Sequence, residues 1–259
     1  MSITEDNMPS KAAAVHEKIR RSGEKELSRD FMALWWSAVA GGITMSTSLI
    51  ARAVLHTYIG NSPFDFLIEA MGYTVGFILV ITANQQLFTE NTVTPVLPFM
   101  SKPSFRRFRR VIRIWLAVFT GNLVGAMIAS LTITYLPIFN HGVIASMQHI
   151  GLHMMENSPM QMFSKGLLAG WLIATLVWIL SCMRHGHILM IFLVTYVIAI
   201  GDFTHIIVGA VEVMYLLLNG LTTLHDAIFQ FGIPTLLGNV IGGTFIFALI
   251  SHAQVRSDG

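Results

Sequence analysis

The chain is organised as long apolar stretches separated by short polar segments. Six of the stretches are long enough to cross a membrane, because a helix of about 20 residues spans about 30 Å of hydrocarbon. Four stretches are continuous, whereas the second and the fifth are each interrupted by polar residues. The predicted spans cover residues 32–55, 65–100, 111–136, 160–183, 187–218 and 228–252.

The two interruptions are the most informative feature of this pattern. The first has the sequence QQLFTEN at residues 85–91, and the second has GDFTH at residues 201–205. A break in a membrane helix leaves backbone groups unpaired, and it survives only beside protein or a water-filled cavity. A histidine halfway along a span is also costly, which marks His205 as a functional candidate. The pattern therefore predicts a transport site near the middle of the membrane, where the two breaks meet.

An internal repeat relates the two halves of the chain. A Gly-Asn pair at residues 121–122 in the third span recurs at residues 238–239 in the sixth, 117 positions later. The same offset pairs Phe88 in the first break with His205 in the second. Each copy contains three spans, an odd number, so we expect the second copy to be inverted in the membrane. The small residues of the Gly-Asn motifs suit either close helix packing or a position beside the pore.

Composition agrees with a membrane protein and narrows its class. Hydrophobic residues make up 54% of the chain and charged residues 12%, against roughly 25% charged residues in a soluble domain. The net charge of +2 is too small to predict binding to nucleic acid. A single cysteine excludes an intramolecular disulfide and a cysteine-based metal site. The sequence contains neither Gly-x-Ser-x-Gly nor His-Glu-x-x-His, so we expect no enzyme activity and no metal or other cofactor.

The basic residues predict the orientation, because cytoplasmic loops carry an excess of lysine and arginine. A basic cluster from Lys102 to Arg110 follows the second span, and the loops after the third and fifth spans contain no lysine or arginine. We therefore expect both termini in the cytoplasm. Residues 1–30 are predicted to form an amphipathic segment on the membrane surface, or alternatively a plug. Residues 31–253 form the predicted channel domain, and 254–259 a cytoplasmic tail.

The breaks and the segment IPTLLGNVIGG at residues 233–243 resemble the formate/nitrite transporter family, over residues 30–252. The resemblance is strongest to an inner-membrane branch of enteric bacteria. It implies an aquaporin-like protomer with helices 2 and 5 broken, assembled as a homopentamer in the bacterial inner membrane with one pore in each protomer. The partners that it implies are a small monovalent anion or weak acid, protons and membrane lipid.

The resemblance also implies roles for individual side chains. His205 resembles the central pore histidine of the family, and Thr89 the threonine that faces it. Leu87 and Phe88 resemble an apolar constriction, and together with Phe203 they are expected to line an opening between Thr89 and His205. Lys165 resembles a lysine of the outer vestibule, a snorkelling lysine at a helix end being the alternative.

Four further polar residues are expected close to this pore without lining it. Asp202 is predicted to cap the second half of the fifth span, because aspartate is a favoured residue at a helix N-terminus. The others are Thr204, Asn122 and Asn239.

Three positions depart from the family pattern. Thr204 stands where the family has an acidic residue, Gly170 where it has an asparagine, and Ile198 where it has an aromatic residue. The sequence therefore leaves the solute open within the class of formate, nitrite, acetate and hydrosulfide. Our hypothesis is that His205 lends the anion a proton during passage. The alternatives are a scaffold or sensor that keeps the fold without transport, and a channel for small neutral solutes.

The orientation can be checked by cysteine labelling in a variant that lacks Cys182, the single native cysteine. Cysteines placed in segments 137–158 and 219–227 should react with an impermeant reagent added outside the cell, because these segments are predicted to be external. A cysteine at position 108 should react only after the membrane is opened. Labelling of position 108 in intact cells would contradict the predicted orientation.

Overall fold

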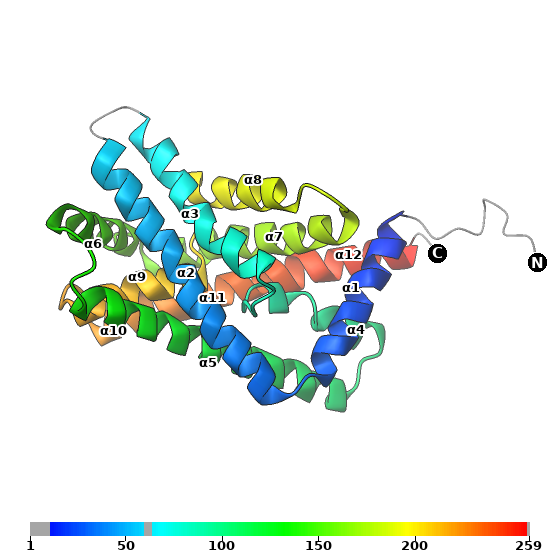
Figure 1. The fold of residues 1–259 in the computed structure, drawn as a ribbon. Coiled ribbons are helices and arrows are strands. Elements are labelled where there is room, and N and C mark those ends of the chain that lie inside the picture. Colours follow the sequence, from blue (N-terminus) through cyan, green and yellow to red (C-terminus); the bar gives the residue numbers. More distant parts are fainter. Residues whose placement is uncertain (1–10, 60–63, 258–259) are drawn as a thin grey trace, which may run out of the picture.

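The computed structural model describes residues 11–59 and 64–257, and in these ranges every regular element is a helix (Figure 1). Five helices are long and apolar enough to cross a membrane. Two shorter apolar helices, α8 (His187–Ile200) and α9 (Ile206–Leu218), follow one another along the chain. The expected all-helical membrane fold is therefore confirmed. The five long helices are α2 (Phe31–Ile59), α3 (Asp65–Thr82), α5 (Phe105–Tyr135), α7 (Pro159–Cys182) and a last helix over Leu224–Val255.

The segment between α5 and α7 was expected to be a loop, but it contains α6 (His141–Met155). The side chain of Asn140 begins this helix by accepting a hydrogen bond from the backbone N–H of Val143. Its 15 residues reach only about 22 Å, which is too short to cross a membrane. One face of α6 is buried against the bundle, so the helix covers one end of it.

The last span begins earlier and ends later than the sequence predicts. It consists of five consecutive helical segments and includes residues up to Ser257, so the predicted tail from residue 254 is helical over its described part. Two of the segments are π-helical, and the second follows the Gly-Asn motif. The segments are α10 (Leu224–Asp226), η3 (Ala227–Gly232), α11 (Ile233–Val240), η4 (Ile241–Ala248) and α12 (Leu249–Ser257).

The chain leaves the helical conformation at both polar interruptions. After α3 ends, residues 83–95 contain turns, an irregular stretch at 85–87 and the 3-10 turn η2 (Glu90–Thr92), and the short helix α4 (Val96–Ser101) follows. Residues 201–205 separate α8 from α9. We call these segments the first break and the second break.

The two breaks begin with the same backbone geometry. Asn84 has φ 53° and Asp202 has φ 50°, and these are the non-glycine residues with positive φ in the described part of the chain. The backbone N–H of Gln85 donates to the carbonyl of Val80, as that of Phe203 donates to Ile198. Asn84 and Asp202 are 118 positions apart, so within the breaks the offset of 117 is wrong by one residue. The counterpart of His205 is therefore Leu87, not Phe88.

Helix α1 (Lys11–Ser28) packs on the bundle beside the first break. Ile19 and Leu27 are each 2% exposed, and α1 contacts α4, α7 and α12. A Cβ atom on Gly23 would lie 2.0 Å from the backbone oxygen of Thr94, so the two backbones touch. Over its described residues, the expected amphipathic segment is thus a helix whose apolar face packs on the bundle.

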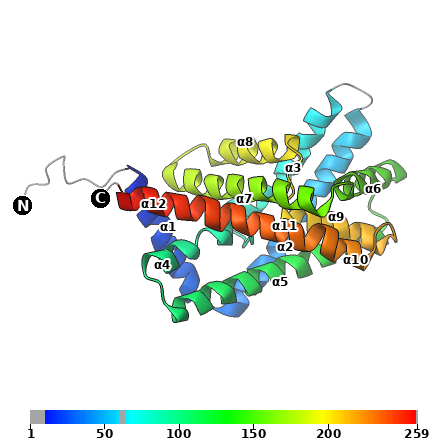
Figure 2. The same ribbon diagram turned by 180° about the vertical axis from the view of Figure 1, so that it is seen from behind.

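The helices give the bundle two distinct ends. Helix α6, the end of α2 and the start of α3 lie at one end, and α1, α4 and α12 lie at the other (Figures 1 and 2). We call these the α6 end and the α1 end.

Close backbone contact between helices generates a prediction for stability. A Cβ atom on Gly170 in α7 would lie 2.3 Å from the backbone oxygen of Asn239, and backbone atoms cannot move aside cheaply. The Gly170→Ala variant should therefore lose about 1–3 kcal/mol of stability, as overpacked cores do. Its melting temperature in detergent should fall below that of the wild type.

Gly142→Ala is the matched control, because its Cβ would meet only side-chain atoms of Thr57 and Asn140, at 3.0 and 3.3 Å. Equal melting temperatures for Gly170→Ala and the wild type would contradict the packing described here.

Candidate functional site

The first and second breaks meet through Thr89 and His205. The hydroxyl oxygen of Thr89 lies 2.7 Å from Nε2 of His205. Thr89 is 0% exposed and His205 is 2% exposed, so the contact lies inside the protein. An opening was expected between these side chains, whereas in the structure they are in direct contact.

The position of His205 fixes which nitrogen of its ring carries the proton. His205 is the N-terminal cap of α9, and its Nδ1 accepts the backbone N–H of Val208 at 3.4 Å. In a neutral ring the proton is therefore on Nε2, and Nε2–H donates to the Thr89 hydroxyl. The ring of Phe77 stands edge-on to the imidazole, with the ring centroids 5.0 Å apart. The expectation that Asp202 caps this helix is wrong, because His205 does.

Asn122 and Asn239 pair the backbone of the two breaks. The Oδ1 atom of Asn122 accepts the N–H of Phe88 at 2.9 Å, and its Nδ2 donates to the carbonyl of Gln86 at 2.9 Å. Asn239 accepts the N–H of Ile206 at 2.9 Å and donates to the carbonyl of Thr204 at 3.0 Å. Each asparagine thus replaces the helical hydrogen bonds that its break lacks.

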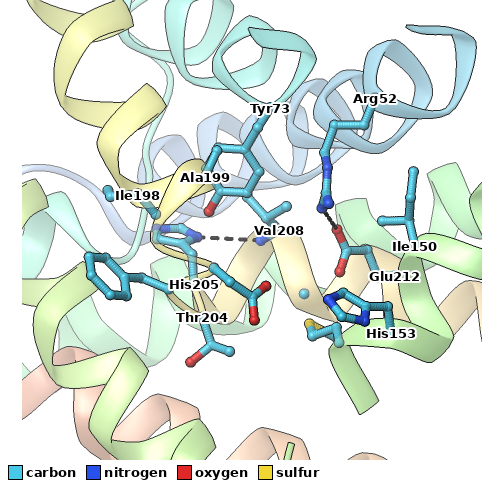
Figure 3. A pocket seen from close by; sticks show the side chains of 14 residues that line it. Arg52, Tyr73, Ile150, His153, Ile198, Ala199, Thr204, His205, Val208 and Glu212 are labelled. Atoms are coloured by element: carbon cyan, nitrogen blue, oxygen red, sulfur yellow. Dashed lines mark hydrogen bonds and ion pairs between the residues drawn. The ribbon is translucent and has the colours of Figure 1, made fainter. Parts of the chain in front are cut away.

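A small cavity of about 30 Å³ leads from the α6 end to His205 (Figure 3). We call it the α6 vestibule. Polar and charged side chains from α2, α6, the second break and α9 share its lining with apolar ones, so it can hold water or a small polar solute. The polar and charged lining residues are Arg52, Tyr73, His153, Asp202, Thr204, His205 and Glu212.

One side of this vestibule is formed by charged groups that were not expected at the site from the sequence. Arg52 donates to Glu69 and to Glu212, which belong to α3 and α9. The sequence carried two signals of this cluster. Arg52 goes against the charge pattern of the loops, and Glu212 lies seven residues after His205 and so on the same helix face.

Lys165 has two polar partners near the N-terminal end of α7. Its Nζ donates to Oδ1 of Asn157 at 2.7 Å and to the carboxylate of Asp202. Its charge reaches the α6 vestibule only through Asp202, which lines the cavity.

A second cavity opens at the α1 end and reaches the first break. We call it the α1 vestibule, and its lining includes Gln86, Glu90, Glu26 and Arg29. The side chain of Gln86 donates to Glu26 of α1 at 3.2 Å, so α1 is bonded directly to the first break. The Thr89–His205 contact thus lies between two vestibules.

The three apolar pore candidates lie in different places. Leu87 is 0% exposed and Phe88 is 3% exposed, and neither belongs to the lining of the two vestibules. The ring of Phe88 packs on Phe119 of α5, with centroids 5.1 Å apart. Phe203 lines the α6 vestibule next to Thr204, whose hydroxyl donates to the carbonyl of Met162 in α7.

Comparison with known proteins agrees with this arrangement. Residues 13–253 match the model of the formate/nitrite transporter family. The chain is 50% identical to inner membrane protein YfdC of Escherichia coli, over 100% of this chain and 83% of the relative. It is 21% identical to formate channel FocA of Haemophilus influenzae, over 90% of each. The expected resemblance, including the inner-membrane branch, is confirmed.

Solved structures show that the fold is shared. A pentameric formate channel with formate bound aligns with a TM-score of 0.75 at 20% identity, covering 88% of this chain and 98% of that chain. An ion channel of the same family aligns with a TM-score of 0.76 at 18% identity, covering 94% and 96%. The family consists of transport proteins and not of enzymes. This chain, with its several apolar spans, therefore belongs to the formate/nitrite transporter family.

Proposed function

We propose that the protein is a channel for small monovalent anions, or for the acids that they form, in the class of formate, nitrite, acetate and hydrosulfide. The observation that supports this proposal best is the buried Thr89–His205 contact between two vestibules. A proton-bearing imidazole at the narrowest part of a path suits a solute that can accept a proton. Relatives named formate channel and formate-nitrite transporter support the same solute class.

A neutral solute crosses a dry constriction at a lower free-energy cost than an anion does. An isolated anion loses tens of kcal/mol of hydration free energy in a dry constriction. Protonating a carboxylate of pKa about 3.5 at pH 7 costs only about 5 kcal/mol. A group that lends a proton therefore lowers the barrier far more than a group that only binds the anion.

His205 is the residue that we propose as the proton donor. In its imidazolium form His205 can give the Nε2 proton to the Thr89 hydroxyl, while that hydroxyl passes its own proton to a solute beside it. The ring is then a neutral imidazole, and it takes up a proton again from the α6 vestibule. A solute that enters from the α6 vestibule reaches His205 past Phe203. The neutral acid then passes Leu87 and Phe88 and ionises in the α1 vestibule.

The same proposal covers assembly and location. A solved relative is a pentamer, and the inner membrane is part of the name of the relative at 50% identity. We propose a homopentamer in the bacterial inner membrane, with one pore per protomer and both termini in the cytoplasm. Large apolar side chains on α5 and α7, such as Leu116 and Trp171, are exposed in the single chain and are available for subunit or lipid contacts.

Anion flux into proteoliposomes tests the proposal. The wild type should conduct one or more of the four anions. The flux should be faster at low external pH, because the acid form of the solute and the imidazolium form of His205 are then more populated. His205→Asn keeps a hydrogen-bonding side chain but cannot carry the proton, so its flux should lose this pH dependence and its selectivity should change.

Unchanged flux with unchanged pH dependence in His205→Asn would mean that the histidine is structural. A wild-type protein that conducts none of these anions would favour the scaffold or sensor, and one that conducts only glycerol or water would favour the neutral-solute channel.

The Thr89 hydroxyl gives a second prediction. Thr89→Val has the same shape but leaves the buried Nε2–H of His205 without an acceptor, which costs about 1–3 kcal/mol. Thr89→Ser retains the acceptor and should stay close to the wild type. The free energy of unfolding of both variants is measured in mixed detergent micelles. Equal stability of Thr89→Val and Thr89→Ser would argue against the hydrogen bond.

A further inference from the structure

The cluster around Arg52 joins three helices at the wall of the α6 vestibule. Nε and Nη2 of Arg52 lie 3.0 and 2.8 Å from Oε1 of Glu69. Nη1 lies 3.2 Å from Oε1 of Glu212. The three residues come from α2, α3 and α9, so the cluster connects both halves of the repeat. Charged groups at membrane depth are expensive, which makes such a cluster a functional candidate.

The guanidinium holds its two carboxylates unequally. Glu69 accepts two hydrogen bonds from Arg52, and its other oxygen lies 2.9 Å from Nδ1 of His56. Glu212 accepts one longer hydrogen bond from Arg52. Glu69 is therefore the fixed partner of the guanidinium, and Glu212 is the partner that can be exchanged.

The cavity reaches only the exchangeable part of this cluster. Arg52 and Glu212 belong to the lining of the α6 vestibule, whereas Glu69 does not. Figure 3 shows one carboxylate oxygen of Glu212 joined to Arg52 and the other directed away from it, with His205 in the same cavity. Lys165 is held by Asp202 and Asn157 and is absent from the lining, so Arg52 is the permanent cation among the described residues that line this vestibule.

We propose that Arg52 is the docking residue for a planar monovalent oxyanion in the α6 vestibule, and that Glu212 is a tethered competitor for the same guanidinium. The proposal rests on the proposed function, because it names the solute that the vestibule selects. In the empty protein the Glu212 carboxylate occupies Nη1. An arriving carboxylate or nitrite takes its place, and the bond to Glu69 stays intact.

The chemistry of the guanidinium selects the class of solute. Glu69 takes Nε–H and one N–H of Nη2, so Nη1–H and the second N–H of Nη2 remain for a solute. This edge of the planar group can bind two coplanar oxygen atoms at once, which a spherical ion cannot offer. Formate, acetate and nitrite have such a pair of oxygens, whereas chloride and hydrosulfide do not. The charge of Arg52 is already balanced by Glu69, so Glu212 adds a negative charge that opposes every arriving anion. Removal of that charge should strengthen docking.

The test measures binding separately from transport. The melting temperature of the purified protein is followed by tryptophan fluorescence as sodium formate is added, with sodium chloride at equal ionic strength as reference. A ligand that binds the folded state raises the melting temperature. Glu212→Gln keeps the shape and the hydrogen bond but removes the charge, and it should lower the half-saturating formate concentration about tenfold, or about 1.4 kcal/mol.

The matched control is Glu17→Gln, which removes another arginine-paired carboxylate, on the exposed side of α1. It should leave the half-saturating concentration at the wild-type value. A folded Glu212→Gln protein with unchanged formate binding, or equal tightening in Glu17→Gln, would overturn the proposal. Absence of formate-specific stabilisation in both the wild type and Glu212→Gln would overturn it as well.

The Arg52→Lys variant is an independent test, because it keeps the positive charge beside Glu69 but loses the planar guanidinium group. The preference for formate over chloride, in thermal protection and in proteoliposome flux, should fall in this variant. A preference that stays at the wild-type value would contradict the assignment of Arg52. Formate binding that depends on Arg52 and Glu212 without any flux would refute the proposed channel and leave the docking site standing.

Discussion

Two interruptions in apolar helices leave backbone groups without helical partners, and the rest of the structure depends on how these groups are paired. Asn122 and Asn239 pair some of them from the neighbouring helices, each with one side chain that accepts from a backbone N–H and donates to the backbone carbonyl two residues earlier. Close approach of these helices needs glycine, as at Gly170, whose α-carbon faces the backbone of Asn239. The glycines let the helices approach and the asparagines pair the backbone of the breaks, and together they hold His205 in place.

The repeated motifs predicted this arrangement of glycines and asparagines only in outline. The spacing of residues along the sequence located both breaks, because polar residues within an apolar run are easy to recognise. It also predicted that Thr89 and His205 lie close together. Spacing could not give the register between the copies. Insertions in the connecting segments change the offset from 117 at Asn122 and Asn239 to 118 at Asn84 and Asp202. Helix α6 was missed because its apolar face is short and its polar residues resemble those of a loop.

Electrostatic contacts were the hardest feature to predict. The partners of Arg52 lie 17 and 160 residues away along the chain, and no local pattern joins them. Lys165 illustrates the same difficulty, since its position near a helix end suggests snorkelling while its amine bonds to Asp202. Charge placement in loops predicted which end each segment faces, but it carries no information about pairs formed between distant helices.

The unequal lengths of the two copies make the two mouths of the path chemically different. Gly42 and Gly170 occupy matching sites 128 positions apart, while Asn84 and Asp202 are 118 apart, so the second hairpin is ten residues shorter. By these offsets Arg52 corresponds to Leu180 and Glu212 to Thr94, both in the lining of the α1 vestibule. An inverted repeat would otherwise present the same chemistry to both compartments. At these matched positions a guanidinium and a carboxylate stand at one mouth and a leucine and a threonine at the other, which gives the pathway an inherent polarity.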